Sequence, residues 1–168
     1  MDYRKYQQSR DAAWQIIIDL KISALPVSVT KICKELNIEV KIYEPKDDND
    51  GFSYIKHGKA YIFVSKNVNV QRQRFTAAHE LGHLILGSDE QEANVFASRL
   101  LAPACVLWGL GVSSPEQIAE LCDISLQAAA FRMKRMQELY ARNKFLLSPL
   151  EQKVFEQFEL YIDKYKIR

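Results

Sequence analysis

The sequence predicts an α+β protein in which a small three-stranded sheet packs on a helix pair, with N-terminal helices and a helical C-terminal part. Residues 38–65 contain a strictly alternating segment followed by a hairpin pattern, while segments before and after them repeat apolar residues at helical spacing. No internal repeat is visible. The chain has 168 residues, 48% of them hydrophobic and 26% charged, which is enough for a globular core.

The N-terminal half is expected to form two helices and then the sheet. Residues 4–22 and 28–37 repeat apolar side chains at helical spacing, with SALPVSV between them. IEVKIYE at 38–44 alternates as a half-buried strand does, and the turn-rich loop PKDDNDG follows. Two β-rich runs around His57 and Gly58 in FSYIKHGKAYIFVS predict a hairpin.

Two consecutive helices are expected in the middle of the chain. Residues 71–86 are apolar on nearly all sides, which is typical of a buried helix, and Gly87 suits its C-cap. Ser88 is expected to cap the next helix with Gln91 as its capping-box partner, and Pro103 to end it.

The rest of the chain is expected to be helical. After the linker GLGVSSP, helices are predicted over 115–122, 125–141 and 149–164, the last starting with the capping sequence SPLE. We therefore divide the chain into a core of residues 1–108 and a helical C-terminal region of residues 109–168. That region ends in the amphipathic helix 149–164.

Composition and charge exclude several classes of protein. The net charge of +2 lacks the basic excess of a duplex-binding protein. The scattered Cys33, Cys105 and Cys122 show no C-x-x-C spacing, which argues against a disulfide framework and a cysteine zinc site. No segment has the length of a membrane span or the apolar core of a signal peptide, so we expect a cytoplasmic protein without membrane contact.

Two of the three histidines lie four residues apart, in the H-E-x-x-H motif His79-Glu80-Leu81-Gly82-His83. Residues i and i+4 share a helix face, so both imidazoles can reach one zinc ion at about 2.0–2.1 Å. Glu80 is rotated off that face and can act on the attacking water instead of binding metal. Burying two unpartnered imidazoles would cost about 1–3 kcal/mol each. The motif therefore predicts one zinc ion per chain, with His79 and His83 as ligands and Glu80 as the catalytic base.

A catalytic zinc ion needs a third protein ligand. No histidine follows His83, so we expect a carboxylate from SDEQEAN, which offers Asp89, Glu90 and Glu92. Glu90 and Asn94 lie one helical turn apart, so Glu90 can bind zinc while Asn94 hydrogen-bonds a ligand. Glu92 points about 200° away from Glu90, so only one of the two can bind. We favour Glu90 and expect Glu92 to be a solvated acid of the first helical turn.

The stretch FTAAHELGHLILG, followed closely by EQEANVFASRLLAP, resembles the ImmA/IrrE family of zinc metallopeptidases. The shared pattern is H-E-x-G-H on a helix and then E-x-x-A-N-x-F-A-x-x-L-L-x-P. The residues in register are Glu90, Ala93, Asn94, Phe96, Ala97, Leu100, Leu101 and Pro103. Ala102 replaces a methionine that is common in the family, at a position that we interpret as packing. The resemblance implies a mini-gluzincin-like site with Glu90 as the third ligand.

The resemblance also implies a function, because enzymes of this family cleave helix-turn-helix repressors of mobile elements or stress regulons. We therefore expect a zinc endopeptidase that relieves repression by cleaving such a repressor, from a mobile element or phage. An edge strand of the sheet is expected to bind the extended substrate. Tyr54, His57 and Tyr61 are near in sequence, but none is assigned as the oxyanion donor. The alternatives are a non-catalytic regulator that binds a repressor or DNA around a structural zinc, and a peptidase with another cytoplasmic substrate.

Residues 115–140 resemble a helix-turn-helix segment, as is found after the peptidase core in this family. Asp123 stands where a turn glycine is common, and the second helix offers few cations, namely Arg132, Lys134 and Arg135. We therefore do not expect direct DNA binding. The helix pair is expected to pack on the core or to bind a partner, and the last helix to dock on the protein and not on a membrane.

Overall fold

The structure, a computed structural model, describes every residue except 1, 88 and 168. The chain divides into two compact units. The first comprises the chain up to Ala13 together with Ser28–Ala97, and the second comprises Trp14–Val27 together with the chain from Ser98 onward. The division at residue 108 that the sequence suggests stays a prediction.

The first unit holds the sheet and the helices that carry the H-E-x-x-H motif and the following acidic segment. Its elements are α1 (Tyr3–Asp19), α2 (Val29–Glu35), β1 (Ile38–Tyr43), β2 (Gly51–Lys56), β3 (Lys59–Ser65), α3 (Val70–Leu86) and α4 (Glu90–Leu101). The C-terminal parts of α1 and α4 belong to the second unit. The bounds of α2, the strands and α3 agree with the sequence expectation to within a few residues.

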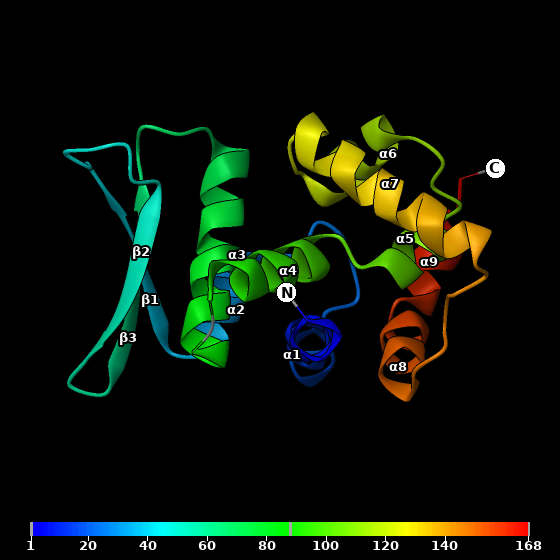
Figure 1. The fold of residues 1–168 in the computed structure, drawn as a ribbon, viewed down its shortest axis with the longest axis horizontal. Coiled ribbons are helices and arrows are strands. Elements are labelled where there is room, and N and C mark those ends of the chain that lie inside the picture. Colours follow the sequence, from blue (N-terminus) through cyan, green and yellow to red (C-terminus); the bar gives the residue numbers. More distant parts are fainter. Residues whose placement is uncertain (1, 88, 168) are drawn as a thin grey trace. The chain divides into compact units, whose positions relative to one another are not determined.

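The sheet has the strand order β1-β3-β2, with β1 parallel and β2 antiparallel to the central β3. The hairpin turns at His57 and Gly58, whose φ angles of 49° and 76° are those of a tight type I′ turn. One face of the sheet packs on α3, and α2 contacts both β1 and α3 (Figure 1). The predicted α+β fold with a three-stranded sheet is therefore confirmed.

The polar groups at both ends of α3 are satisfied by flanking residues. The side chain of Asn69 accepts a hydrogen bond from the backbone N–H of Arg72. At the other end Gly87 adopts a left-handed conformation, with φ of 58°, and donates its N–H to the carbonyl of His83. The predicted C-cap is therefore present, and α3 is well defined over the residues that bear the motif.

The packing of α3 on α4 depends on a residue without a side chain. A Cβ atom at Gly82 would lie 3.1 Å from Cδ1 of Phe96 and 3.2 Å from Cα of Ala93. Phe96 and Ala93 are themselves fully buried. Because any larger residue at position 82 would push against these atoms, Gly82 sets the distance between the two helices.

The second unit is helical. It contains α5 (Ala104–Gly109), α6 (Pro115–Cys122), α7 (Leu126–Ala141), α8 (Pro149–Gln157) and α9 (Glu159–Tyr165). Its fully buried side chains include Leu107, Leu110, Ile118, Met136 and Phe158. No described helix has both the length and the apolar character that crossing a membrane would require.

Two features of the second unit differ from the sequence expectation. α5 was not expected, because Pro103 was interpreted only as a helix stop; here it stands at the N-cap of α5, where its missing N–H is not needed. The helix expected over 149–164 is interrupted at Phe158, where the φ and ψ angles are −93° and 1°. Beside this break, the side chain of Gln157 donates to the carbonyls of Ile17 and Ile22.

The close approach at Gly82 predicts a stability effect. Gly82→Leu should lower the free energy of unfolding by about 1–3 kcal/mol despite the better helix propensity of leucine, because the added side chain overpacks against Phe96. Urea denaturation would measure this change. Val70→Leu, at an exposed position of the same helix, should change the stability by less than about 0.5 kcal/mol. Equal effects of the two substitutions would show that the α3–α4 spacing is not constrained at Gly82.

Candidate metal centre

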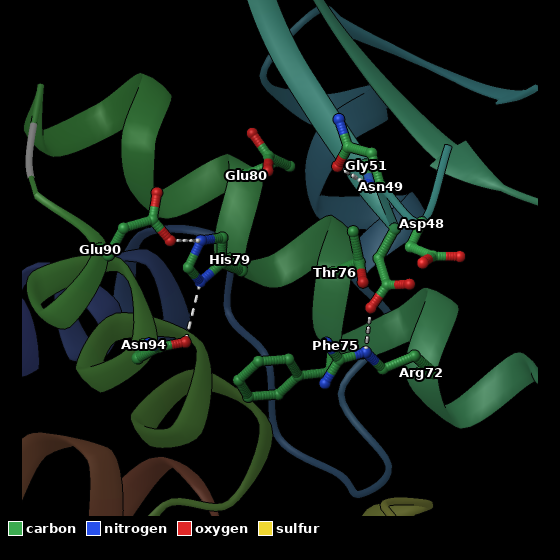
Figure 2. A pocket seen from close by; sticks show the side chains of 11 residues that line it. Asp48, Asn49, Gly51, Arg72, Phe75, Thr76, His79, Glu80, Glu90 and Asn94 are labelled. Carbon is green, nitrogen blue, oxygen red and sulfur yellow. Dashed lines mark hydrogen bonds and ion pairs between the residues drawn. The ribbon is translucent and has the colours of Figure 1, made fainter. Parts of the chain in front are cut away.

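Three predicted ligands converge where α3 meets α4. His79 Nε2 lies 3.1 Å from His83 Nε2 and 3.1 Å from Glu90 Oε2. The other carboxylate oxygen, Glu90 Oε1, lies 3.1 Å from His83 Nε2. The imidazoles come from successive turns of α3, and Glu90 is the first residue of α4. Figure 2 shows Glu90 beside His79.

The spacing of these donor atoms fits a zinc ion. Ligand atoms at zinc-ligand distances of about 2.0–2.1 Å in a tetrahedral shell lie about 3.3–3.4 Å apart. The two imidazole nitrogens lie 3.1 Å apart, and each lies 3.1 Å from one of the two oxygens of Glu90, which is close to this value. Two imidazole nitrogens and one carboxylate also leave the fourth position that a catalytic zinc site needs. The donor set and its geometry therefore suit zinc.

Asn94 contacts the first histidine. Its side-chain oxygen Oδ1 lies 3.0 Å from His79 Nδ1. Because an amide oxygen only accepts hydrogen bonds, this contact suits the tautomer in which Nδ1 carries the proton and Nε2 keeps its lone pair for a metal. Asn94 is thus in contact with a predicted ligand.

Glu80 lies beside the ligand atoms and is only 8% exposed. Its Oε2 accepts a hydrogen bond of 2.7 Å from the hydroxyl of Ser53 on β2. Sequence reasoning missed Ser53. The alternation of FSYIK could have placed Ser53 on the covered face of β2, but nothing in the sequence indicates which residue of α3 it meets.

Two carboxylates lie close enough to the imidazole pair to be considered as ligands. One oxygen of Glu80 and the nitrogens of His79 and His83 lie within 4.8 Å of one another. The oxygens of Glu90 are nearer, at 3.1 Å from each imidazole, and one Glu80 oxygen is already bound by Ser53. Glu90 is therefore the nearer of the two carboxylates to the imidazoles, and Glu80 is the one held by Ser53.

Glu92 has a structural contact and does not reach the histidines. Its carboxylate accepts from the N–H of Asp89 at 3.2 Å, and the Asp89 carboxylate accepts from the N–H of Glu92 at 3.0 Å. This reciprocal pair caps α4 in the manner of a capping box. The side chain of Glu92 is 13% exposed, so the expectation of a solvated acid was wrong. The expected cap at Ser88 lies outside the described residues.

Lys5 of α1 joins this cap. Its ammonium lies 3.1 Å from Asp89 Oδ2 and 3.4 Å from Glu92 Oε2. The N–H of Glu92 and the Lys5 ammonium together hold the pKa of Asp89 below its usual value. The first turn of α4, which begins with Glu90, is therefore fixed from within and from α1.

The cysteines take no part in the centre. Cys33, Cys105 and Cys122 are buried thiols. Burial raises the pKa of Cys33 to about 11 and that of Cys105 to about 12, so both remain neutral thiols near pH 7.

The tyrosines considered for oxyanion binding lie on the far side of the sheet. Ser53 points to α3, so its neighbour Tyr54 faces away, where its ring stacks on that of Tyr61 at 5.5 Å. His57 lies in the hairpin turn. None of these three residues lines the pocket beside the metal centre.

That pocket has a volume of about 500 Å³ and extends from the centre along α3 (Figure 2). All of its walls belong to the first unit. The lining residues are Asp48, Asn49, Asp50, Gly51, Arg72, Phe75, Thr76, His79, Glu80, Glu90 and Asn94. A volume of this size accommodates a segment of peptide.

Comparison with known proteins agrees with this arrangement. The family model Peptidase_M78, described as the IrrE N-terminal-like domain, matches residues 33–134. The match spans more than half of the chain and includes the whole sheet and both helices of the centre. No curated protein matches the chain.

The roles of Glu90 and Glu92 at the start of α4 can be distinguished by experiment. Glu90→Gln should weaken zinc binding by about tenfold or more, because it replaces an anionic ligand oxygen by an amide. Glu92→Gln should leave zinc affinity nearly unchanged, since glutamine can keep the capping hydrogen bond. Competition with a chromophoric chelator would measure both affinities. The opposite ranking would transfer the ligand role to Glu92.

Proposed function

The chain belongs to the IrrE N-terminal-like peptidase family, and from this premise we propose that it is a zinc-dependent endopeptidase. The observation that carries the proposal is the cluster of His79, His83 and Glu90, in which the imidazole nitrogens lie 3.1 Å apart and each lies 3.1 Å from an oxygen of Glu90. A site that only needed structural zinc would be closed by a fourth protein ligand. Here the pocket opens beside the three donors, and the buried carboxylate of Glu80 adjoins them.

Each residue of the centre has a defined part in peptide hydrolysis. His79, His83 and Glu90 would hold the zinc ion, which when bound supplies a Lewis acid for the scissile carbonyl and the attacking water. Ser53 holds one oxygen of Glu80 and leaves the other to take a proton from that water. Glu80 then delivers the proton to the leaving amine.

The edge strand β2 supports a mode of substrate binding. In the described sheet β2 pairs with β3 along one side only. Gly51, at the start of β2, lines the pocket, and Ser53 contacts the catalytic glutamate. An extended peptide added to the open side of β2 would therefore run past Glu80, with backbone hydrogen bonds holding it in place.

We propose a helix-turn-helix repressor of a mobile element or phage as the substrate, cleaved in the cytoplasm to relieve repression. The support is the resemblance to the ImmA/IrrE family in the two motif helices. Direct DNA binding is not part of the proposal. Of the cations on α7, Arg132 is 5% exposed and donates to the carbonyl of Ala102, and Arg135 pairs with Glu138.

The decisive test replaces the proton acceptor. Glu80→Gln should keep zinc and fold but lose cleavage by several orders of magnitude, because the amide cannot take the proton of the attacking water. The assay mixes each protein with candidate helix-turn-helix repressors and follows fragments by mass spectrometry. A regulator with a structural zinc would give no fragments with either protein. Full relief of repression in cells by Glu80→Gln would also refute the endopeptidase.

Ser53 is a positioning residue whose role can be tested separately. Ser53→Ala should keep zinc but lower kcat by about 10–100-fold at nearly constant KM, because Glu80 loses the group that orients its carboxylate. Ser53→Thr, which keeps the hydroxyl, should restore most of the activity. If the alanine variant were as active as wild type, the hydrogen bond to Glu80 would have no part in the reaction.

A further inference from the structure

We infer that the end of the pocket formed by Asp48, Asp50 and Arg72 is a substrate subsite for a basic side chain, lysine or arginine, next to the scissile bond. The inference rests on the proposed function, because it treats the pocket as the path of a bound peptide. It adds a preference for a basic residue in the peptide sequence that is cut. The residues that would produce this preference lie outside the metal centre.

The distance between the two ends of the pocket suits a long side chain. Arg72 and His79 both line the pocket on α3 and are seven residues apart, which corresponds to about 10 Å along the helix axis. Figure 2 shows Asp48 and Arg72 at one end and Glu90 and Asn94 at the other. An extended lysine or arginine side chain reaches about 6–7 Å from its Cα atom. A residue adjacent to the scissile bond could therefore place its charged group at the Asp48 end.

The loop that forms this end is held in place by hydrogen bonds to the sheet. The Tyr43 hydroxyl donates to the carbonyl of Asn49 at 3.0 Å, and the N–H of Ser65 donates to the carbonyl of Asp50 at 2.8 Å. Gly51 then lies so close to α3 that a Cβ atom would overlap the methyl group of Thr76. The walls are thus formed before a ligand binds, which lowers the entropic cost of binding.

The charges at this end favour a cation. The guanidinium of Arg72 is paired with Asp50, so these two charges offset each other. Asp48 is exposed, and within the described chain no cation lies at ion-pair distance from its carboxylate. One negative charge is therefore in excess. An acidic side chain would have to compete with Asp50 for Arg72, whereas a basic one gains a partner.

The wall between the two ends suits the stem of such a side chain. The Phe75 ring lines the pocket, with the Arg72 guanidinium carbon 6.0 Å from its centroid (Figure 2). Lysine and arginine bury their methylene groups along apolar surfaces of this kind while their charged ends stay near water. From the metal centre outward, the pocket wall is therefore first apolar and then anionic.

The test measures peptide binding without turnover, on zinc-loaded Glu80→Gln protein. Labelled decapeptides that differ only in one central residue (arginine, lysine, glutamine or glutamate) would be titrated by fluorescence anisotropy. The arginine and lysine peptides should bind about three- to fivefold more tightly than the glutamine peptide, and the glutamate peptide more weakly, as for one partly exposed ion pair. Equal binding of all four peptides would overturn the inference.

Substitutions in the loop assign the preference to one carboxylate. In the same background, Asp48→Asn should abolish the preference for basic peptides and Asp48→Lys should reverse it toward glutamate. Asp47→Asn is the matched control, because Asp47 does not line the pocket and asparagine keeps an oxygen for the N–H of Asn49. It should leave the preference intact. A preference that survived Asp48→Lys would refute the assignment.

Failure of the subsite and failure of the enzyme give different results. Cleavage of a mixed peptide library by wild type, dependent on Glu80 but without enrichment of basic residues beside the cut bonds, would overturn the subsite and leave the peptidase intact. Selective binding of basic peptides without any cleavage by wild type would uphold the subsite as a binding site and refute the peptidase.

Discussion

The close approach of α3 and α4 at Gly82 is the constraint on which the centre depends. The histidines belong to one helix and the predicted third donor to the next, so an ion would be held only where these two helices meet. A glycine facing Phe96 and Ala93 permits this contact. The cap of α4 and its link to Lys5 then determine where along that contact Glu90 points.

Around this contact the sheet has a second function besides forming a core. β2 brings Ser53 to Glu80 and, through Gly51, brings the preceding loop against α3. One strand therefore contributes to the orientation of the Glu80 carboxylate and to the wall of the pocket. In the proposed function, the same strand would serve both the chemistry and the binding of the peptide.

Features that depend on residues close together in the sequence could be predicted, and those that depend on distant residues could not. The histidine pair and the relation of Glu90 to Asn94 depend on helical periodicity, which is a local property, and the hairpin at His57 and Gly58 depends on local turn geometry. The bond from Ser53 to Glu80 joins residues 27 positions apart and depends on how β2 lies on α3. No pattern within either element contains that information.

Other details that the sequence did not reveal have the same cause. The capping pair of Asp89 and Glu92 contacts Lys5 of α1, a distant partner that is invisible in a local window. The interruption at Phe158 lies beside a glutamine that is bound to the carbonyls of Ile17 in α1 and of Ile22 after it. Local rules name the residues that can cap or continue a helix, and tertiary contacts choose among them.

The short separation of the proposed ligands along the chain has a consequence for folding. His79, His83 and Glu90 fall within one short segment, so bringing them together in the unfolded chain closes only small loops. An ion could therefore bind the unfolded segment with appreciable affinity, and such binding offsets part of the stabilisation that the folded site gains. Zinc would then stabilise the contact between two helices more than the fold as a whole. It could bind before the chain has finished folding.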